Sequence, residues 1–485
     1  MKRAALLLLA AAAAARCGAD VPTLTLGDAI RLALHHNHLL KVSSYGPGIA
    51  RANLLVARGE FDPAFVVNRN YSSTDFNTSI GPIPVLDLTK VDTYSAGVQG
   101  ILPVGTQYNI YGSTQEVRDV YNGITKNFQS FGGFQVTQPL LKGFGFAANL
   151  EQVRIQKANR SISDQSYKQS AINTVSNVLM AYIGLQSAHD QLDAARRSMA
   201  LAERQVAENE KKYRVGNISQ SDLIVARAYK AELDDPLLSA ERGVRDAQNQ
   251  LREVIGGDVF YEDEPLFVLG PIDLPDVAVD RHADLRRALE MRPDYQIARL
   301  GIVQNKAVEA AARNAILPEV DFVGGYGYNG SSQYFSASRQ MVEDHLNPSV
   351  SAGLQVTIPF TFAVGRGNLR AARLTREQSE ESLRNTEATI ALAVAQADGQ
   401  VETTRKRVAA DRAYNDLAKQ ALEAEEKKYK AGTSSENFVV QQEEQQAQAE
   451  SVLTNAVASE RLAIVGYDQA LGTTLERYGV KLADN

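Results

Sequence analysis

The sequence is poor in the residues that carry chemistry. Of its 485 residues one is cysteine, six are histidine and none is tryptophan. No Ser/His/Asp or Cys/His set occurs at a meaningful spacing, so we expect neither an enzyme nor a bound cofactor. His35, His36 and His38 lie close together, but without paired cysteines and within an amphipathic helical segment they do not indicate a metal site.

Blocks of like charge and long apolar runs are missing as well. The chain has 51 basic and 57 acidic residues and a net charge of -6, with no basic cluster. Nucleic acid is therefore not an expected partner. Beyond the N-terminal region no segment reaches the ~18 consecutive apolar residues of a transmembrane helix. Any membrane-spanning part must then be a β-barrel.

The N-terminus has the organisation of an export signal. Two basic residues precede an apolar run from Ala4 to Ala15, which is too short to span a bilayer. Small residues at Cys17 and Ala19 favour a signal peptide over 1–19. The mature chain would then lack cysteine, as suits an oxidising periplasm. In the alternative, Cys17 becomes a lipidated N-terminus, although Arg16 before it fits that signal badly.

An internal repeat divides the chain into two halves. The segment Asp28–Leu34 is echoed by Asp284–Leu289, and Ala288 follows Ala33 by 255 positions. The later pairs are Phe61–Pro63 with Ile316–Pro318, Phe134–Pro139 with Leu354–Pro359, and Tyr213–Gly216 with Tyr429–Gly432. The order is kept while the offset shrinks, which indicates a duplication followed by a loop deletion.

The repeat defines the expected domain organisation. It comprises the signal peptide 1–19, a first repeat at 20–256, an equatorial linker at 257–283, a second repeat at 284–475 and a C-terminal tail at 476–485. Within each repeat a helical segment is followed by strands and then by a long hairpin of two helices.

The strand segments alternate between an apolar face and a polar or small face. The apolar positions are Phe61, Phe65, Val67 and Tyr71 in the first half, and Val320, Phe322, Tyr326 and Tyr328 in the second. This alternation is typical of strands with lipid on one side and water on the other. Tyr94–Thr114, around Pro103-Val-Gly105, predicts an additional hairpin. We favour an extension outside a barrel wall; inside the wall it would give six strands per chain.

The long helices carry heptad seams. The first runs over 144–213 and the second over 366–430, with lengths of about 105 and 98 Å. Seam positions include Ile172, Val175, Leu179 and Tyr182 in the first helix, and Ile390, Val394, Val401 and Val408 in the second. Each long helix has enough length for two shorter helices stacked beside it: 26–60 with 217–256, and 284–313 with 434–475. Such rods bury their seams only against neighbours, so we expect an oligomer.

The tips of the two hairpins carry the most specific motifs. They are Tyr213-Arg-Val-Gly-Asn-Ile-Ser-Gln-Ser-Asp222 and Tyr429-Lys-Ala-Gly-Thr433. With the Leu24-Thr-Leu-x-x-Ala29 opening and the paired Val-Thr-x-Pro strands, they resemble the TolC family of outer-membrane channels. The resemblance covers the chain from Leu24 to Leu471.

The resemblance implies a mainly α protein with a β-barrel membrane part. Three protomers would form a trimeric channel, in which a long antiparallel coiled-coil α-barrel continues a β-barrel of about four strands per protomer. It also implies the outer membrane of a diderm bacterium with a periplasmic extension. Outer-membrane lipid, a membrane-fusion adaptor and an inner-membrane pump of the RND or ABC type are the implied partners.

The resemblance also implies roles for residues at the tips. Val215, Gly216, Gly432 and Thr433 match positions where the helices reverse and meet the adaptor. Asp222 and Tyr429 match positions that hold neighbouring coils together by a hydrogen bond in the closed state. Ser434 stands where some members carry an arginine in that lock, so closure should depend less on salt bridges.

A constriction is expected just beyond the second tip. Phe438 and Gln441 fall where certain members place a ring of aspartates, so we expect a hydrophobic gate at Phe438 instead. Glu443 and Glu444 follow. We interpret them, like other carboxylates on the heptad helices, as a solvated helix face; a role in cation preference is the alternative.

The function implied is a passive efflux duct opened by the adaptor. Two rival hypotheses stay open on the sequence. One is the exit duct of a type I protein-secretion system, and the other is a periplasmic coiled-coil scaffold without a pore. The alternating strands argue against the scaffold.

Overall fold

The structure is a computed structural model that describes residues 23–80, 83–119, 124–256, 268–270, 272, 274 and 277–482. The predicted signal peptide and most of the predicted linker lie outside the described residues. The chain divides into two compact units. Unit 1 contains the chain up to Pro47, Asp164–Ile297 and Arg384–Asn485; unit 2 contains Gly48–Ser163 and Ala298–Leu383. Each unit combines pieces of both repeats, and the predicted domain boundaries stay a prediction.

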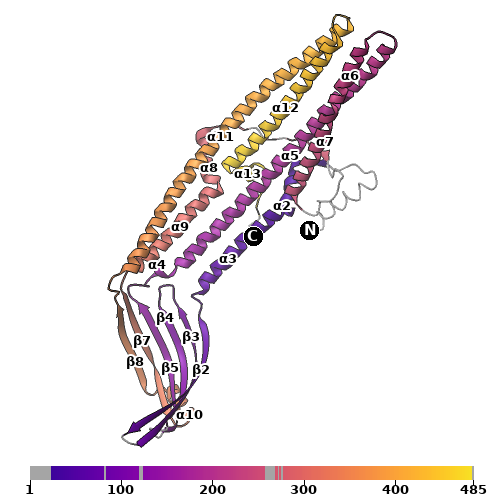
Figure 1. Ribbon diagram of the computed structural model, residues 1–485. Coiled ribbons are helices and arrows are strands. Elements are labelled where there is room, and N and C mark those ends of the chain that lie inside the picture. Colours follow the sequence, from indigo (N-terminus) through magenta and orange to yellow (C-terminus); the bar gives the residue numbers. More distant parts are fainter. Residues whose placement is uncertain are drawn as a thin grey trace. The chain divides into compact units, whose positions relative to one another are not determined.

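Helices form most of the chain (Figure 1). They are α2 (Leu26–His36), α3 (His38–Gly59), α4 (Phe146–Asn149), α5 (Glu151–Arg214), α6 (Gln220–Glu232), α7 (Asp234–Ile255), α8 (Arg281–Met291), α9 (Pro293–Asn314), α10 (Phe335–Glu343), α11 (Ala363–Lys430), α12 (Glu436–Leu471) and α13 (Thr474–Arg477). The two predicted long helices are confirmed as α5 with 64 residues and α11 with 68. Within the described ranges, no helix is both long and apolar enough to cross a membrane.

Three of the predicted helical segments are each interrupted at one residue. Asn37 separates α2 from α3, and Arg292 separates α8 from α9; both have extended backbone angles. Arg292 precedes a proline, which disfavours the helical conformation. Leu233 separates α6 from α7, where Pro236 in the first turn of α7 has no N–H to extend the preceding helix.

The two interruptions between short helices have the same function in packing. The Asn37 side chain donates to the carbonyl oxygen of Val254 at 2.7 Å. The Arg292 guanidinium donates to the carbonyl oxygen of Ala470 at 3.0 Å. Each acceptor lies in the last turn of the return helix of its own repeat, where carbonyls have no helical partner. The residue that interrupts the short helices therefore supplies a hydrogen-bond donor for a backbone carbonyl at the end of the return helix.

Unit 2 contains one six-stranded antiparallel sheet, in the order β2-β3-β4-β5-β7-β8. The strands are β2 (Ala64–Ile80), β3 (Ile83–Ile101), β4 (Gln107–Asp119), β5 (Ile124–Pro139), β7 (Glu319–Ser332) and β8 (Pro348–Thr357). The predicted additional hairpin at Tyr94–Thr114 is present, but the favoured count of about four strands, with this hairpin as an extension, is wrong; the sheet has the six strands of the alternative. This hairpin forms β3 and β4, which pair with a neighbour on both sides. Pairing on both sides satisfies the backbone groups that an extension would leave exposed.

The two faces of this sheet differ as predicted. One face carries a row of exposed apolar side chains aligned by the register: Phe65, Val98, Ile110, Phe134 and Tyr326. The adjacent row on the opposite face is polar or small: Gln99, Asn109, Gln135, Gly325 and Ser351. Phe61, predicted on the apolar face, lies in the turn before β2.

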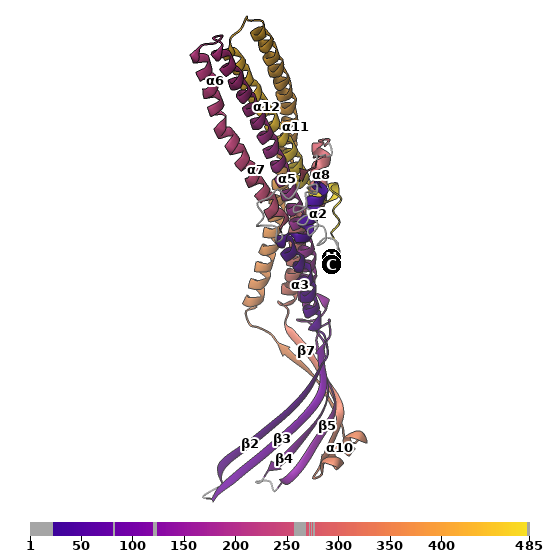
Figure 2. The same cartoon turned by 90° about the vertical axis from the view of Figure 1, so that its right-hand side faces the viewer.

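Helix α10 packs on the apolar face of the sheet, against β5 and β7 (Figure 2). It lies close to the strands because Gly330 and Gly132 have no side chain beneath it. A Cβ at Gly330 would lie 1.9 Å from the Ser338 carbonyl oxygen. The buried Ser338 hydroxyl lies 2.8 Å from Ser130 Oγ and 3.0 Å from the Gly330 carbonyl oxygen. Its polar group is thus satisfied within the contact.

Two apolar clusters form the core of unit 1. The first centres on the α5 seam residues Ile172, Val175, Leu179 and Tyr182 and includes residues of α2 and α7. The second is smaller and centres on Ile390, Val394 and Val401 of α11, with residues of α8 and α12. A two-stranded parallel sheet of β1 (Thr23–Leu24) and β6 (Val268–Leu269) lies beside the first cluster. Both predicted seams are buried.

The carboxylates do not all lie on a solvated helix face. Asp284, Asp398, Asp468 and Glu443 are buried, whereas Glu444 is exposed. The prediction is wrong for Asp398 of α11 and for Glu443 and Asp468 of α12. Heptad spacing shows which side chains can face a neighbour, and an acidic residue at such a position is buried with the seam.

Candidate functional site: the two hairpin tips

The tips of the two helical hairpins have the same backbone turn. In the first tip the Gly216 amide donates to Tyr213 O at 2.9 Å and the Asn217 amide to Lys212 O at 2.9 Å. In the second, Gly432 donates to Tyr429 O and Thr433 to Lys428 O, both at 3.0 Å. The glycines have φ of 77° and 75°. This is the Schellman end of a helix, in which glycine accepts a left-handed conformation that side chains disfavour.

The helices that leave the two tips begin differently. Helix α6 starts with a capping box in which Ser219 and Asp222 bind each other's backbone amides, at 3.1 Å in both directions. Helix α12 starts at Ser435 without a side-chain cap. Here Ser434 instead donates to the Glu425 carboxylate, which Lys428 also contacts at 2.9 Å. These contacts hold the pKa of Glu425 below its usual value, with the Lys428 hydrogen bond as the larger cause.

The structure shows where the predicted lock residues lie in one chain. Asp222 is engaged locally with Ser219. The Tyr429 hydroxyl accepts a hydrogen bond from Lys212 Nζ at 2.9 Å, and the same ammonium lies 4.9 Å from the ring centroid. This contact joins the last turn of α5 to the last turn of α11. Our sequence interpretation missed Lys212, although a Lys-Tyr pair precedes both tips.

The predicted gate residues lie on an exposed stripe of α12. Phe438 is 58% exposed, and Gln441 follows on the same side of the helix. Val439 and Val440, by contrast, are buried. Val215 at the first tip is 71% exposed. In one chain both apolar side chains are therefore open to contact with another molecule.

A polar layer lies behind this stripe. Glu443 of α12 is buried beside Tyr229 of α6. Burial raises the pKa of Tyr229 to about 12, and the negative charges of Glu443 and Glu444 contribute. Tyr229 is therefore neutral at any physiological pH and can only donate or accept hydrogen bonds. The seam near the tips is accordingly more polar than the seam at Leu179.

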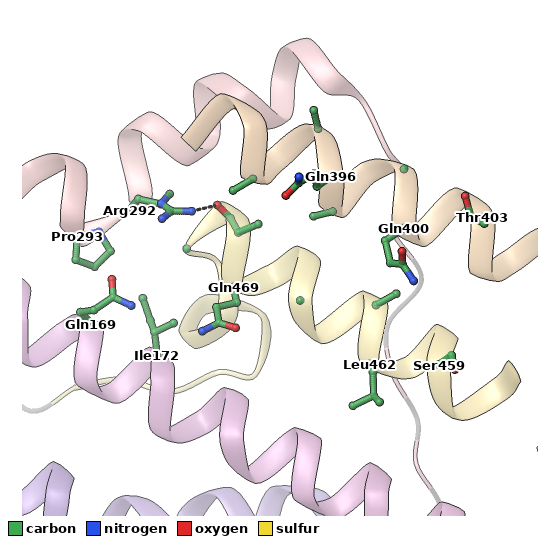
Figure 3. A pocket seen from close by; sticks show the side chains of 18 residues that line it. Gln169, Ile172, Arg292, Pro293, Gln396, Gln400, Thr403, Ser459, Leu462 and Gln469 are labelled. Carbon is green, nitrogen blue, oxygen red and sulfur yellow. Dashed lines mark hydrogen bonds between the residues drawn. The ribbon is translucent and has the colours of Figure 1, made fainter. Parts of the chain in front are cut away.

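A recess of about 1090 Å³ in unit 1 lies between α5, α11, α12 and the α8–α9 interruption (Figure 3). Amide and hydroxyl side chains line it, among them Gln169, Gln396, Gln400 and Gln469. Arg292 is the charged residue among the described lining residues, and its guanidinium contacts Asp294 and the Ala470 carbonyl. The lining contains no nucleophile with an adjacent base, so it has none of the parts of an acid–base site.

The residues that the structure describes include no group of three or more His, Cys, Asp or Glu side chains placed to hold a metal ion. His35 and His38 are exposed on α2 and α3, and His36 is half-buried.

The chain thus combines long helical hairpins with an antiparallel sheet that has one apolar face. The outer membrane efflux protein family model matches residues 29–257 and 285–473. The chain belongs to this family. It is an outer-membrane efflux channel of the TolC type, in the outer membrane of Gram-negative bacteria, and the family is not one of enzymes.

Individual relatives agree with this assignment. The chain is 25% identical over 355 residues to the outer membrane protein TolC of Vibrio cholerae, covering 70% of this chain and 78% of the relative. Its fold is similar to that of the Campylobacter jejuni CmeC outer membrane channel, with TM-score 0.63, 18% identity and coverage of 93% and 86%. The open state of the Neisseria gonorrhoeae MtrE channel gives TM-score 0.66, 19% identity and coverage of 93% and 90%.

Proposed function

We propose that three copies of this chain form the outlet duct of a tripartite efflux pump, opened at the helical tips by a periplasmic adaptor. The observation that carries the proposal is the pair of tips. The same glycine turn ends both long helices, and an exposed apolar side chain lies next to the first turn (Val215) and in the first turn of the helix that follows the second (Phe438). A duplicated turn gives each chain two equivalent places for a partner to bind.

Exposed apolar stripes support the trimer. Along α3, Leu39, Val42, Tyr45, Ile49 and Val56 recur at steps of three, four and seven. Their exposed fractions are 78, 69, 61, 61 and 75%. One apolar stripe of this length on one side of a helix needs a covering surface. A neighbouring copy would supply it, and would also pair with the open edges of the sheet at β2 and β8.

The lining of the duct follows from the sheet faces. The polar and small face would line the passage, and the apolar face would contact outer-membrane lipid. An inner-membrane pump of the RND or ABC type would supply the energy, because the proposed duct is passive.

The gate has a direct test. Phe438→Ala shortens a side chain that we propose constricts the passage, so single-channel conductance in planar bilayers should rise. Leu238→Ala on α7 is the matched control, since Leu238 is exposed to a similar extent, 64% against 58%. Unchanged conductance in the Phe438 variant would remove the gate from the proposal.

Adaptor contact can be tested separately. Photo-reactive amino acids placed at Val215 and Thr433 should cross-link to the adaptor of the same pump, and one placed at Leu238 should not. Equal cross-linking at all three positions would contradict contact through the tips. Asp222, Tyr429 and Ser434 belong to this proposal as residues that hold neighbouring coils closed.

A further inference from the structure

Basic side chains gather on one side of α9 and α11 near the sheet. The two helices contact each other through the side chains of Asn305 and Ser379, which are 2.6 Å apart. Between this contact and the sheet the helices contain two acidic residues, Glu309 and Glu377, and six basic ones. The basic residues are Lys306, Arg313, Arg366, Arg370, Arg373 and Arg376. These helix ends are therefore strongly positive, although the whole chain has a net charge of -6.

One carboxylate joins the two helices on this side. Glu309, whose side chain is 12% exposed, contacts Arg376 at 2.8 Å, Arg313 at 3.0 Å and Arg373 at 3.6 Å. Arg376 also contacts two acidic residues of its own helix. Arg313 and Arg373 reach the same oxygen of Glu309 and remain exposed. The basic residues of α9 and those of α11 therefore lie on the same side of the helix pair.

The positive charge on this side is not balanced. Lys306, Arg366 and Arg370 are exposed and have no acidic partner among the residues that the structure describes. The first two turns of α5, which contacts α9, add two basic residues and one acidic residue. The opposite side of the two helix ends is uncharged. It contains Val308 and Ala312 of α9 and Asn368, Ala371 and Thr375 of α11.

The basic side of the helices and the apolar face of the sheet lie on the same side of unit 2. The Leu140 amide donates to the Val320 carbonyl oxygen at 2.7 Å, and both residues continue the apolar-face positions of their strands. For L-residues this bond puts β7 to the right of β5 when the apolar face is viewed with the helices upward. Helix α5 follows β5 and α9 leads into β7, so α9 has α5 on its left and α11 on its right. In a right-handed helix that runs toward the sheet, with Gln304 facing α5 and Asn305 facing α11, the basic positions then face the viewer.

The apolar surface of the sheet ends where the basic side begins. The apolar alternation of β8 continues through Ile358 and Phe360, which are 60% and 105% exposed. Helix α11 starts three residues later. Arg366 and Arg370 lie in its first two turns, within about 11 Å of its start. An apolar surface that ends against unpaired arginines matches the boundary between the apolar core of a membrane and its headgroups.

We propose that these arginines bind the phosphate groups of anionic membrane lipids, in the headgroup layer next to the helices. The proposal rests on the proposed function in one respect, that the apolar face of the sheet contacts lipid. Guanidinium groups bind phosphate oxygens in pairs, and basic residues beside a membrane attract anionic headgroups. Lipid is favoured over a dissolved anion in the passage, because the proposed passage lies on the other side of the wall, where the helix ends are uncharged.

A single introduced tryptophan can report the lipid at this boundary, since the chain has none. Phe360→Trp places the probe on a fully exposed position at the end of the apolar surface. Full-length protein would be reconstituted in phosphatidylcholine vesicles with increasing fractions of phosphatidylglycerol or phosphatidylcholine brominated on the acyl chains, which quenches nearby tryptophan. Half-quenching should need an about fivefold lower fraction of the brominated phosphatidylglycerol, the effect of about one basic contact.

Variants of α11 test the arginines themselves. Arg366→Gln with Arg370→Gln should abolish the preference for phosphatidylglycerol. The matched control adds Asn368→Arg and Thr375→Arg to this variant, which restores the net charge at exposed positions on the opposite side of the same helix. The preference should stay absent in the control. A preference that survives the first change, or that returns with the second, would overturn the proposal.

The remaining outcomes separate this proposal from the proposed function. The reversal potential of a planar bilayer in a salt gradient should be the same for the wild type and for Arg366→Gln with Arg370→Gln. A shift toward cation selectivity with unchanged quenching would show that the arginines line the passage, and would overturn the proposal. Quenching without any headgroup preference would overturn it alone. If neither lipid quenched the probe, lipid contact at the apolar face would be contradicted as well.

Discussion

The two repeats differ in chemistry at one buried position of their long helices. Three pairs of seam positions 216 residues apart are apolar and buried in both: Val178 and Val394, Leu185 and Val401, Leu192 and Val408. The pair between them, Tyr182 and Asp398, is fully buried in both repeats but chemically different. The duplicated backbone plan has therefore been kept while one buried polar group was exchanged for another.

The two buried groups are satisfied to different degrees. The Tyr182 hydroxyl lies 2.8 Å from Leu24 O and 2.9 Å from Gly270 O, beside the β1–β6 pair. Neither carboxylate oxygen of Asp398 has a hydrogen-bond partner among the described residues. Burial raises the pKa of Asp398, and the charge of Asp284 adds to the effect. The first repeat thus has the larger apolar cluster and a bonded polar group, and the second has a smaller cluster and buried carboxyl groups.

The largest expected effect lies in the first cluster. Leu179→Ala removes a fully buried side chain and should lower the free energy of unfolding by about 3–4 kcal/mol. Val401→Ala in the second cluster should cost about 2 kcal/mol, because fewer methyl groups are lost. Urea unfolding in detergent at one fixed protein concentration measures both. If Leu179→Ala lowered the free energy of unfolding by no more than Val401→Ala does, the first cluster would not contribute more to stability than the second.

The second effect is a pH dependence that comes from a carboxyl group of the second repeat. Burial raises the pKa of Asp468 to about 6, although Arg477 at 2.7 Å opposes the shift. A raised folded-state pKa means that the stability contribution of the protonated group is present below about pH 4 and is lost as pH rises through about 6. Two units correspond to about 3 kcal/mol.

Asp468→Asn removes this titration. Relative to the variant, the wild-type protein should therefore lose up to about 3 kcal/mol of unfolding free energy between pH 4 and pH 8. The measurement is the midpoint of urea unfolding for both proteins across that range. If the unfolding midpoints of the two proteins change in parallel with pH, the charge of Arg477 fully compensates the burial of the Asp468 carboxylate.

A third, smaller effect compares the exchanged pair directly. Tyr182→Phe leaves two buried carbonyl oxygens without the hydroxyl and should cost about 2 kcal/mol. Asp398→Asn removes a buried charge at the same shape and should change stability by less than about 1 kcal/mol at neutral pH, in the stabilising direction. The thermal midpoint of the helical circular dichroism signal distinguishes the two. A large loss in the Asp398 variant would mean that its carboxylate has a partner in the assembled protein.

Sequence patterns identified the elements whose signal is local. The long helices, their seams and the tip glycines follow from heptad spacing and from a glycine just past a helix end, and these depend on neighbouring residues alone. The interruptions at Asn37 and Leu233 were missed because a single residue hardly changes a 3.6-residue period. Prolines were the available signal at two of the three interruptions, Pro236 after Leu233 and Pro293 after Arg292.

Features that depend on a neighbour in space could not be predicted in this way. The alternation in Tyr94–Thr114 is the same for a strand inside the sheet and for a separate hairpin, so it could not show that β3 and β4 pair on both sides. The burial of Asp398 and Glu443 likewise depends on which helix covers them. For the candidate site, the turn at Gly216 followed from sequence, whereas the Lys212–Tyr429 contact joins residues 217 positions apart.

The smallest effect should be the same in both repeats. At Gly216 and Gly432 a Cβ would meet nothing within 4 Å, so an alanine at either costs only the left-handed backbone conformation, about 1 kcal/mol. The Asn217 and Thr433 amides, which close the two turns, should exchange with solvent about fivefold faster in the respective variants. Hydrogen-exchange mass spectrometry measures this without unfolding the protein. Because α6 has a capping box and α12 has none, a larger change at Gly432 would show that the cap also stabilises the turn, and that the tips differ in strength as well as in chemistry.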